Sequence, residues 1–147
     1  MKTNKKKQLN GFTLIEALFA AMLLGLVIAA LAASSGAFTM ANGYGVDLST
    51  AEFLIEEVRE LTANVDVDTL LTSYDGQTFN PPKDVSNSDM TDFSEFSQQV
   101  VVEHVQSGNF DQIDSTATSD FVRVTVTVTK GAAPISSTSW IRARLGS

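Results

Sequence analysis

The chain has 147 residues, enough for one domain of ordinary size together with an extension. It contains no cysteine, which excludes disulfide bonds and thiolate metal sites. The formal net charge is −7, and removing residues 1–11, which carry four lysines and no acid, would change it to −11. A body this acidic disfavours nucleic-acid or anionic-lipid binding by the residues that follow the lysines.

The first predicted element is an apolar helix directly after the lysine-rich start. No charged residue occurs from Ala17 to Val46, and residues 17–33 are all alanine, glycine or larger apolar residues. With residues 12–15 they give about 20 apolar positions, which at ~1.5 Å per residue match a hydrocarbon core of about 30 Å. We therefore predict a transmembrane or filament-core helix over residues 12–41, apolar on all sides.

A secretory signal peptide is the first alternative for this segment, because it also combines a basic region with an apolar one. Ala32, Ala33 and Ser34 offer small residues for a cleavage site. Two residues argue against it. Glu16 stands at the start of the apolar run, where a signal peptide has no use for an acid. Gly11, a poor helix former, separates the basic part from the apolar part.

An amphipathic helix is predicted over residues 46–65. Acidic residues and Arg59 occupy one face of it, and apolar residues recur on the other at steps of three and four: Leu48, Ala51, Leu54, Ile55, Val58, Leu61 and Val65. Such a helix packs on a globular body. Between the two helical parts, the sequence Asn42-Gly43-Tyr44-Gly45 predicts a weakened or bent helix.

The rest of the chain is predicted to form a loop and then a sheet. Residues 66–95 are acidic, rich in serine and threonine and interrupted by prolines, which indicates a loop with a short strand or turn at 74–79. Residues 96–147 are predicted to form an antiparallel sheet. Its best strand is 121–130, where valines alternate with Arg123 and threonines.

Further strands are predicted at 96–105 and 139–145, with a turn region at 131–137. The predicted fold class is therefore α+β. A long N-terminal helix, membrane-embedded in its first half and amphipathic in its second, packs on a small antiparallel sheet. Residues 42–147 form the globular domain in this prediction.

The most informative stretch is Gly11-Phe12-Thr13-Leu14-Ile15-Glu16. With the lysines before it and the apolar run after it, it resembles the processing and assembly signature of bacterial type IV pilins and type II secretion pseudopilins. The resemblance covers the leader and the apolar helix. Over the rest of the chain it is an agreement of pilin-like architecture alone.

The resemblance implies a role for each residue of the motif. Residues 1–11 would be a basic leader on the cytoplasmic side, as the positive-inside rule expects. Prepilin peptidase would cut between Gly11 and Phe12, and the new amine of Phe12 would be methylated. Glu16, which opposes both helix propensity and membrane insertion, would pair with the N-terminal amine of a neighbouring subunit.

Other candidate sites are weaker. His104 stands alone without a nucleophile or ligand set, which favours a structural role. The acidic loop offers a possible calcium site, although its spacing matches no EF-hand loop and favours a solvated surface: Asp84, Asp89, Asp92 and Glu95. Trp140, Arg142 and Arg144 share a strand face. They either form an inter-subunit surface or cover the sheet, and the sequence favours neither.

The sequence predicts a structural filament subunit of a type IV pilus or type II secretion pseudopilus, not an enzyme, and no cofactor or metal. A minor subunit is favoured because the chain is short, has no cysteine pair and no proline before Pro81. Expected partners are prepilin peptidase, other subunits, an inner-membrane assembly platform and membrane lipid. The chain would be a single-pass inner-membrane protein with an extracytoplasmic domain, and then part of a filament.

Two alternatives stay open. The first is a membrane-anchored extracytoplasmic binding protein that never polymerises and keeps its leader. The second is an exported protein cut near Ser34. The sequence leaves open which machine would use a filament subunit, since adhesion, motility, DNA uptake and secretion share this N-terminal design.

Overall fold

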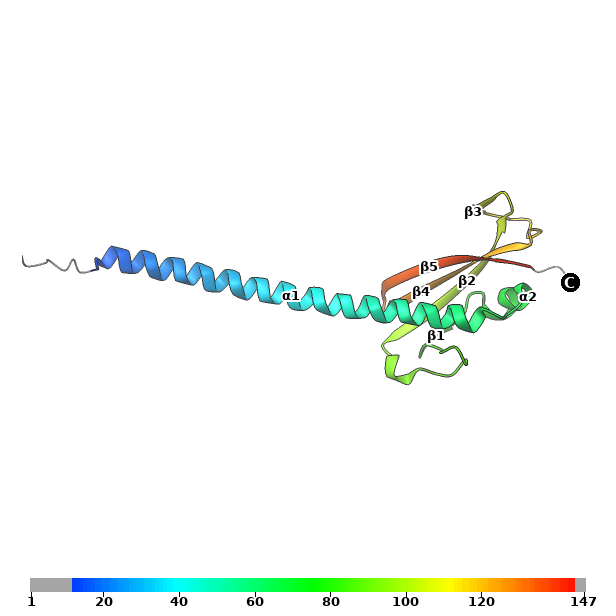
Figure 1. Ribbon diagram of the computed structural model, residues 1–147, viewed down its shortest axis with the longest axis horizontal. Helices are drawn as coiled ribbons and strands as arrows, with labels where there is room; N and C mark the ends of the chain where they lie inside the picture. The colour runs from blue at the N-terminus through cyan, green and yellow to red at the C-terminus, as the bar shows by residue number, and fades with distance from the viewer. Residues whose placement is uncertain (1–11, 145–147) are drawn as a thin grey trace, which may run out of the picture. The chain divides into compact units, whose positions relative to one another are not determined.

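The structure is a computed structural model that describes residues 12–144. The leader predicted over residues 1–11, and with it Gly11, lies outside the described residues, as does Leu145. The chain divides after Gly43 into two compact units. Figure 1 shows the helices and strands, which are α1 (Leu14–Thr62), α2 (Val67–Thr69), β1 (Thr78–Phe79), β2 (Phe96–Gln106), β3 (Asn109–Ile113), β4 (Phe121–Lys130) and β5 (Ala133–Ala143).

The first unit contains the apolar part of α1. Every residue from Phe12 to Val46 is exposed, and the part of α1 before Gly43 is long and apolar enough to cross a membrane. The predicted apolar helix is confirmed. The predicted weakening at residues 42–45 does not interrupt α1, because all four are helical. Each glycine there costs about 1 kcal/mol relative to alanine, which is not enough to end a helix stabilised on one side by packing.

In the second unit, α1 packs on a small antiparallel sheet, so the α+β fold class is confirmed. The helix buries Ala51, Leu54, Ile55 and Val58 against one face of the sheet. Opposite them, β4 contributes four valines that are fully buried: Val122, Val124, Val126 and Val128. Burying one such side chain stabilises the fold by about 1.5–3 kcal/mol, so these contacts dominate the domain.

The helix prediction needs two corrections. Leu48 is exposed, although Asp47 beside it already contacts Lys130 of β4. The helix ends at Thr62 and not at residue 65, and Thr62 is buried because its hydroxyl donates to the carbonyl of Val58 at 2.8 Å. A threonine whose hydroxyl is hydrogen-bonded to a helix carbonyl can be buried among apolar residues.

The sheet has the strand order β1-β2-β4-β5, and β3 pairs with β2. The strands predicted at 96–105 and 121–130 are confirmed. The turn predicted over 131–137 is wrong, since β5 already begins at Ala133 and the turn is only Gly131 and Ala132. A register shift between Val128 and Thr129 and the small residues of early β5 hide the alternation there. The sequence analysis also missed β3.

The predicted loop 66–95 contains several short elements. They are α2, a π-helical turn (η1, Leu70–Tyr74), β1 and a 3-10 turn (η2, Thr91–Phe93). The short strand or turn expected at 74–79 corresponds to β1. The others are one turn or two long, below the length at which periodicity shows in a sequence.

One buried side chain connects the helix, the sheet and this loop. Gln98 on β2 is fully buried, and its amide nitrogen donates to the carbonyls of Leu54 at 2.8 Å and Lys83 at 3.1 Å. Its amide oxygen accepts from the Lys83 backbone N–H at 2.7 Å. Gln98 thus satisfies both backbone groups of Lys83 and fixes the loop against α1 and β2.

We predict that Gln98→Leu destabilises the domain, because it leaves the Lys83 backbone groups without partners. The expected loss is about 1–3 kcal/mol in the free energy of unfolding. Urea denaturation of a fragment that begins near Asn42 measures this free energy. We expect the fragment to be soluble and to show both helix and strand by circular dichroism. Gln99→Leu, exposed on the same strand, is the matched control. Equal stability of the two variants would show that the Gln98 bonds contribute nothing net.

Candidate processing and assembly site

The start of α1 is closed by a reciprocal pair of side chains. The carboxylate of Glu16 accepts from the Thr13 backbone N–H at 3.0 Å and from the Thr13 hydroxyl at 2.8 Å. The Thr13 hydroxyl oxygen in turn accepts from the Glu16 backbone N–H at 3.3 Å. This is a capping box, which satisfies backbone donors that have no partner at a helix N-terminus.

The capping box corrects one step of the sequence analysis. Glu16 was taken to oppose helix formation, yet at the third position of a helix its carboxylate favours it, also through the helix dipole. Thr13 was missed, although Thr-x-x-Glu before an apolar run is the sequence signal for this cap. Phe12, directly before the cap, is 83% exposed.

The apolar surface after the cap has no covering within the described chain. Leu18, Phe19, Met22 and Leu23 are each more than 60% exposed. Gly25 is helical, and nothing lies within 4 Å of where a side chain would begin. This surface therefore requires a partner that is itself apolar, either lipid or other helices.

In the globular unit, two carboxylates of the acidic loop, those of Asp84 and Asp89, make contacts within the loop. The Asp84 carboxylate accepts from the backbone N–H groups of Ser86 and Ser88, both at 2.8 Å. Asp89 pairs with Lys83 at 2.7 Å. Within residues 12–144 no group of three or more histidine, cysteine or acidic side chains is placed to hold a metal ion. The arrangement favours a surface loop that is ordered by its own acids.

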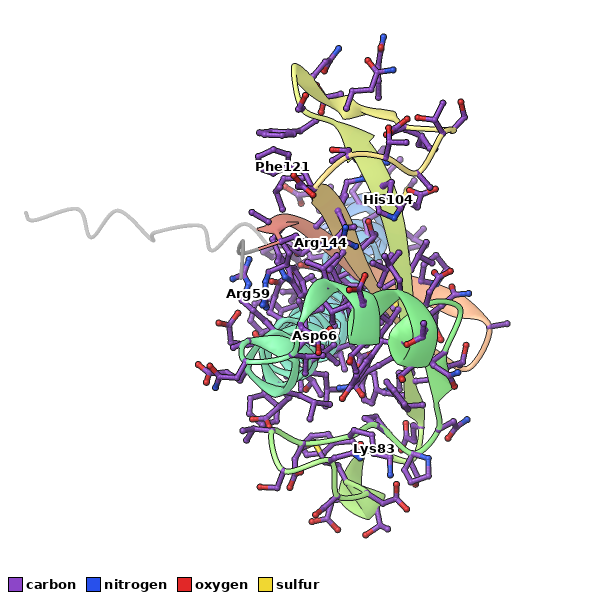
Figure 2. The ribbon with its side chains drawn as sticks, turned by 90° about the vertical axis from the view of Figure 1, so that its right-hand side faces the viewer. Arg59, Asp66, Lys83, His104, Phe121 and Arg144 are labelled. Atoms are coloured by element: carbon purple, nitrogen blue, oxygen red, sulfur yellow. The ribbon has the colours of Figure 1, made fainter. Side chains whose placement is uncertain are left out.

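His104 lies apart from this loop, as Figure 2 shows with Lys83 and His104 at opposite sides of the labelled Asp66. Its Nδ1 is 3.0 Å from the carbonyl oxygen of Ser119, and its own carbonyl accepts from the Asp114 N–H at 2.8 Å. These contacts give His104 a structural role beside the turn that follows β3.

Asp114 organises that turn. Its carboxylate accepts from the side chain and backbone of Thr116, and also from the backbone N–H groups of Thr118 and Ser119. These hydrogen bonds, with the Thr116 hydroxyl first, lower the pKa of Asp114 to about 2.

We predict that the 114–119 turn opens only in strong acid. A depressed folded-state pKa contributes stability above the ordinary pKa of 3.8, and that contribution is lost as the pH falls through about 2. Amide exchange measured by NMR should show protection of Thr118 and Ser119 retained at pH 4 and lost near pH 2. Asp114→Asn should remove the pH dependence of this protection, and protection factors that are equal at pH 4 and pH 2 in the natural chain would contradict the role of Asp114.

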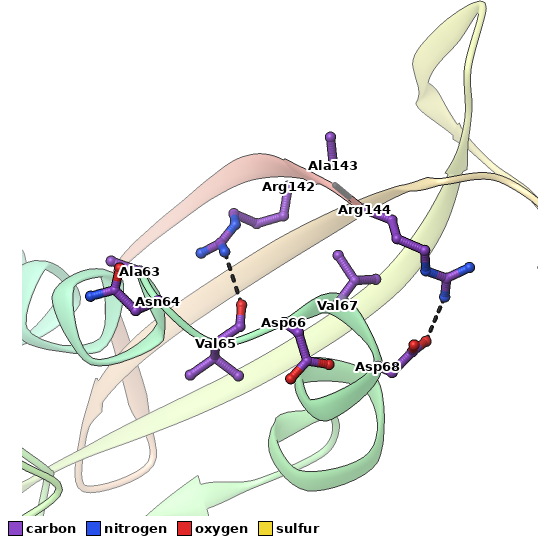
Figure 3. A pocket seen from close by; sticks show the side chains of 9 residues that line it. All are labelled: Ala63, Asn64, Val65, Asp66, Val67, Asp68, Arg142, Ala143 and Arg144. Atoms are coloured by element: carbon purple, nitrogen blue, oxygen red, sulfur yellow. Dashed lines mark hydrogen bonds and ion pairs between the residues drawn. The ribbon is translucent and has the colours of Figure 1, made fainter. Parts of the chain in front are cut away.

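Trp140, Arg142 and Arg144 lie on the face of β5 that turns toward α1. Arg59 stands over the Trp140 ring at 5.0 Å. Arg142 donates to the carbonyls of Thr62 at 2.7 Å and Val65 at 2.9 Å, which caps the end of α1, and Arg144 pairs with Asp68. Figure 3 shows both arginines reaching across a cavity of about 470 Å³ toward residues 63–68. Of the two interpretations, covering the sheet is observed directly.

The globular unit thus offers ordered surface loops, whereas the N-terminal unit offers a capped, uncovered apolar helix. Residues 6–32 match the family described as the prokaryotic N-terminal methylation motif. This motif is the signature of type IV pilins and pseudopilins, and it supports a precursor that is processed by prepilin peptidase. The helix-on-sheet layout is pilin-like. Comparison with curated proteins and with solved structures gave no significant match.

Proposed function

We propose that the chain is the precursor of a filament subunit, either a minor pilin or a minor pseudopilin. The observation that carries the proposal is the methylation motif at residues 6–32, joined to a helix whose residues from Phe12 to Val46 are all exposed. The motif implies a structural subunit with prepilin peptidase and other subunits as partners. The apolar helix accords with a membrane-anchored precursor.

In this proposal residues 1–11 are a leader, residues 12–41 form the helix that moves from membrane to filament core, and residues 42–147 remain extracytoplasmic. The membrane holds the helix before assembly, and other helices replace the lipid afterwards. An assembly platform in the inner membrane would carry out the transfer.

Small residues support close helix packing in such a core. Every fourth position of the apolar part of α1 is alanine or glycine, namely Ala17, Ala21, Gly25, Ala29, Ala33, Ala37 and Ala41. Small residues at this spacing let helix backbones approach one another in apolar surroundings. The larger leucine, methionine and phenylalanine side chains between them would fill the space around the contact.

Glu16 is the proposed assembly residue. A charge within a bilayer costs about 2.5–3.5 kcal/mol on insertion scales, and the Thr13 cap supplies hydrogen bonds but no positive charge. Cleavage after Gly11 would create a positive charge on the new N-terminal amine of Phe12. The amine of the same chain lies about 6 Å away along the axis at ~1.5 Å per residue. A neighbour's amine comes closer at one stagger alone, so this pair would fix the register between subunits.

The second candidate is an anchored protein that does not polymerise. It shares the exposed helix, but it gives no reason for a methylation motif. The mass of the mature N-terminus separates the candidates. A methylated Phe12 corresponds to the filament subunit and an intact Met1 to the anchored protein, whereas a start near Ser34 corresponds to the exported protein considered in the sequence analysis.

We predict that Gly11→Val blocks processing, because glycine lets the backbone extend at the scissile bond and approach the protease closely. Mass spectrometry of the membrane-bound chain should find nearly all of it uncut, whereas the natural chain begins at Phe12. Gly25→Val is the matched control and should be cut normally, since open space surrounds Gly25. Trimming of Gly11→Val at Phe12 would place the processing site elsewhere.

We predict that Glu16→Ala is cut normally but does not enter filaments. Glu16→Gln separates the two roles of the residue. Glutamine also serves at this position of a capping box, yet it carries no charge to pair with an amine. If charge pairing controls assembly, Glu16→Gln fails like Glu16→Ala, and Glu16→Asp, with its shorter reach, is impaired. Immunoblots of sheared filaments measure the three variants. Recovery of Glu16→Gln at the natural level would leave capping as the role of Glu16.

A further inference from the structure

The first half of the outer edge of β5 contains features that discourage pairing with another strand, and the second half does not. Pro134 and the register shift opposite Thr129 disrupt the edge near Ala133, as natural edge strands commonly do. From Ser137 to Ala143 the pairing with β4 is regular, and this part contains no proline, lysine or bulge. A sheet edge without such features can pair with another strand.

The backbone groups at this edge can be assigned from the register. The N–H of Arg144 donates to the carbonyl of Asp120 at 2.7 Å, so Arg144 directs its backbone groups toward the β4 side. In an antiparallel pair the direction alternates. Ser137, Ser139, Ile141 and Ala143 therefore direct their N–H and C=O groups outward. Among residues 12–144 no strand pairs with β5 on that side.

The hydrophobic core is only partly covered beside this edge. On β4 the valines facing α1 are fully buried, whereas Trp140 on β5 is only half-buried. A cavity of about 470 Å³ lies next to it, lined by Arg59, Ala63, Trp140, Ile141, Arg142 and Ala143. An added strand would cover Trp140 and close this cavity between β5 and the last turn of α1.

The charges at the cavity indicate what kind of strand fits. The chain has ten basic residues, of which four are in the leader, and three of the remaining six surround this edge: Arg59, Arg142 and Arg144. Arg59 pairs with Glu56 and Arg144 with Asp68. Arg142 donates to two carbonyls, and among the described residues it forms no ion pair with an acid. Pairing of two β5 edges would bring arginines together, which disfavours a symmetric dimer.

We propose that the outer edge of β5, from Ser137 to Ala143, binds an extended acidic segment of an adjacent filament subunit by strand addition. Main-chain hydrogen bonds would give the affinity, and a carboxylate at Arg142 would give the preference for acidic segments. The inference rests on the proposed function for the source of the segment, but not for the binding chemistry of the edge.

The binding chemistry is tested with the full-length chain in detergent micelles and an eight-residue peptide of alternating valine and aspartate. Amide exchange of Ser139 and Ile141 should slow at least tenfold at saturation. The corresponding valine–lysine peptide should give no slowing, and neither should the acidic peptide with a proline at its centre. Equal effects of the acidic and basic peptides, or no protection at β5, would overturn the proposal.

The role in filaments is tested with Ile141→Pro. Proline removes an outward N–H and leaves the hydrogen bonds to β4 intact, which an edge strand tolerates. The variant should be cut normally and retain its unfolding temperature, but its recovery in sheared filaments should fall at least fivefold. Arg59→Glu, which replaces a cation at the cavity with an acid and leaves the backbone of β5 unchanged, should act in the same direction.

The outcomes distinguish the two proposals. Normal recovery of both variants in filaments overturns the strand-addition site and leaves the filament function intact. Absence of the natural chain from filaments contradicts the filament function and removes the adjacent subunit as the source. Protection of β5 by the acidic peptide would then still establish the edge as a binding site for acidic strands.

Discussion

The uncovered apolar surface of α1 is the constraint on which the rest of the chain depends. From Phe12 to Val46 no side chain is buried, and nearly all of them are apolar or small. Apolar surface costs about 25 cal/mol per Å² in water, so a helix of this length cannot remain there alone. The lysine-rich start, the methylation motif at residues 6–32 and the single charge at Glu16 are consistent with the proposed helix that exchanges lipid for protein surroundings.

After residue 46 the surroundings of the same helix change. Its apolar face narrows to a stripe that the sheet covers, and its acids become available for contacts with polar side chains. Asp47 and Glu95 both pair with Lys130, and these hydrogen bonds raise the pKa of that lysine. Glu52 accepts from the Ser136 hydroxyl at 2.5 Å. One continuous helix thus joins a segment that needs apolar surroundings to a domain whose own residues bury its apolar core.

The sequence predicted those parts of the fold that repeat a single pattern. The alternating valines of β4 gave its bounds, and the apolar steps of α1 gave most of its buried face. Early β5 and β3 were not predictable, because early β5 consists mainly of small residues and all five residues of β3 are exposed, so neither shows a burial pattern. Within the 66–95 region, the position of Lys83 depends on hydrogen bonds to Gln98, which is distant in sequence. At the candidate site, Glu16 stood out as a charge among apolar residues, whereas Thr13 was overlooked although the Thr-x-x-Glu spacing indicates a capping box.

The capping box and the proposed charge pair are compatible on energetic grounds. A cap contributes about 0.5–2 kcal/mol, less than the roughly 2.5–3.5 kcal/mol cost of placing a carboxylate in a bilayer. Thr13 therefore reduces the cost of carrying Glu16 before assembly without removing it. Both bonds from Thr13 reach the same carboxylate oxygen, Oε2, so Oε1 has no part in the cap. An amine at Oε1 would supply the missing charge while the cap stays closed. In the proposed function, the same residue can therefore begin the helix in the membrane and select a neighbour in the filament.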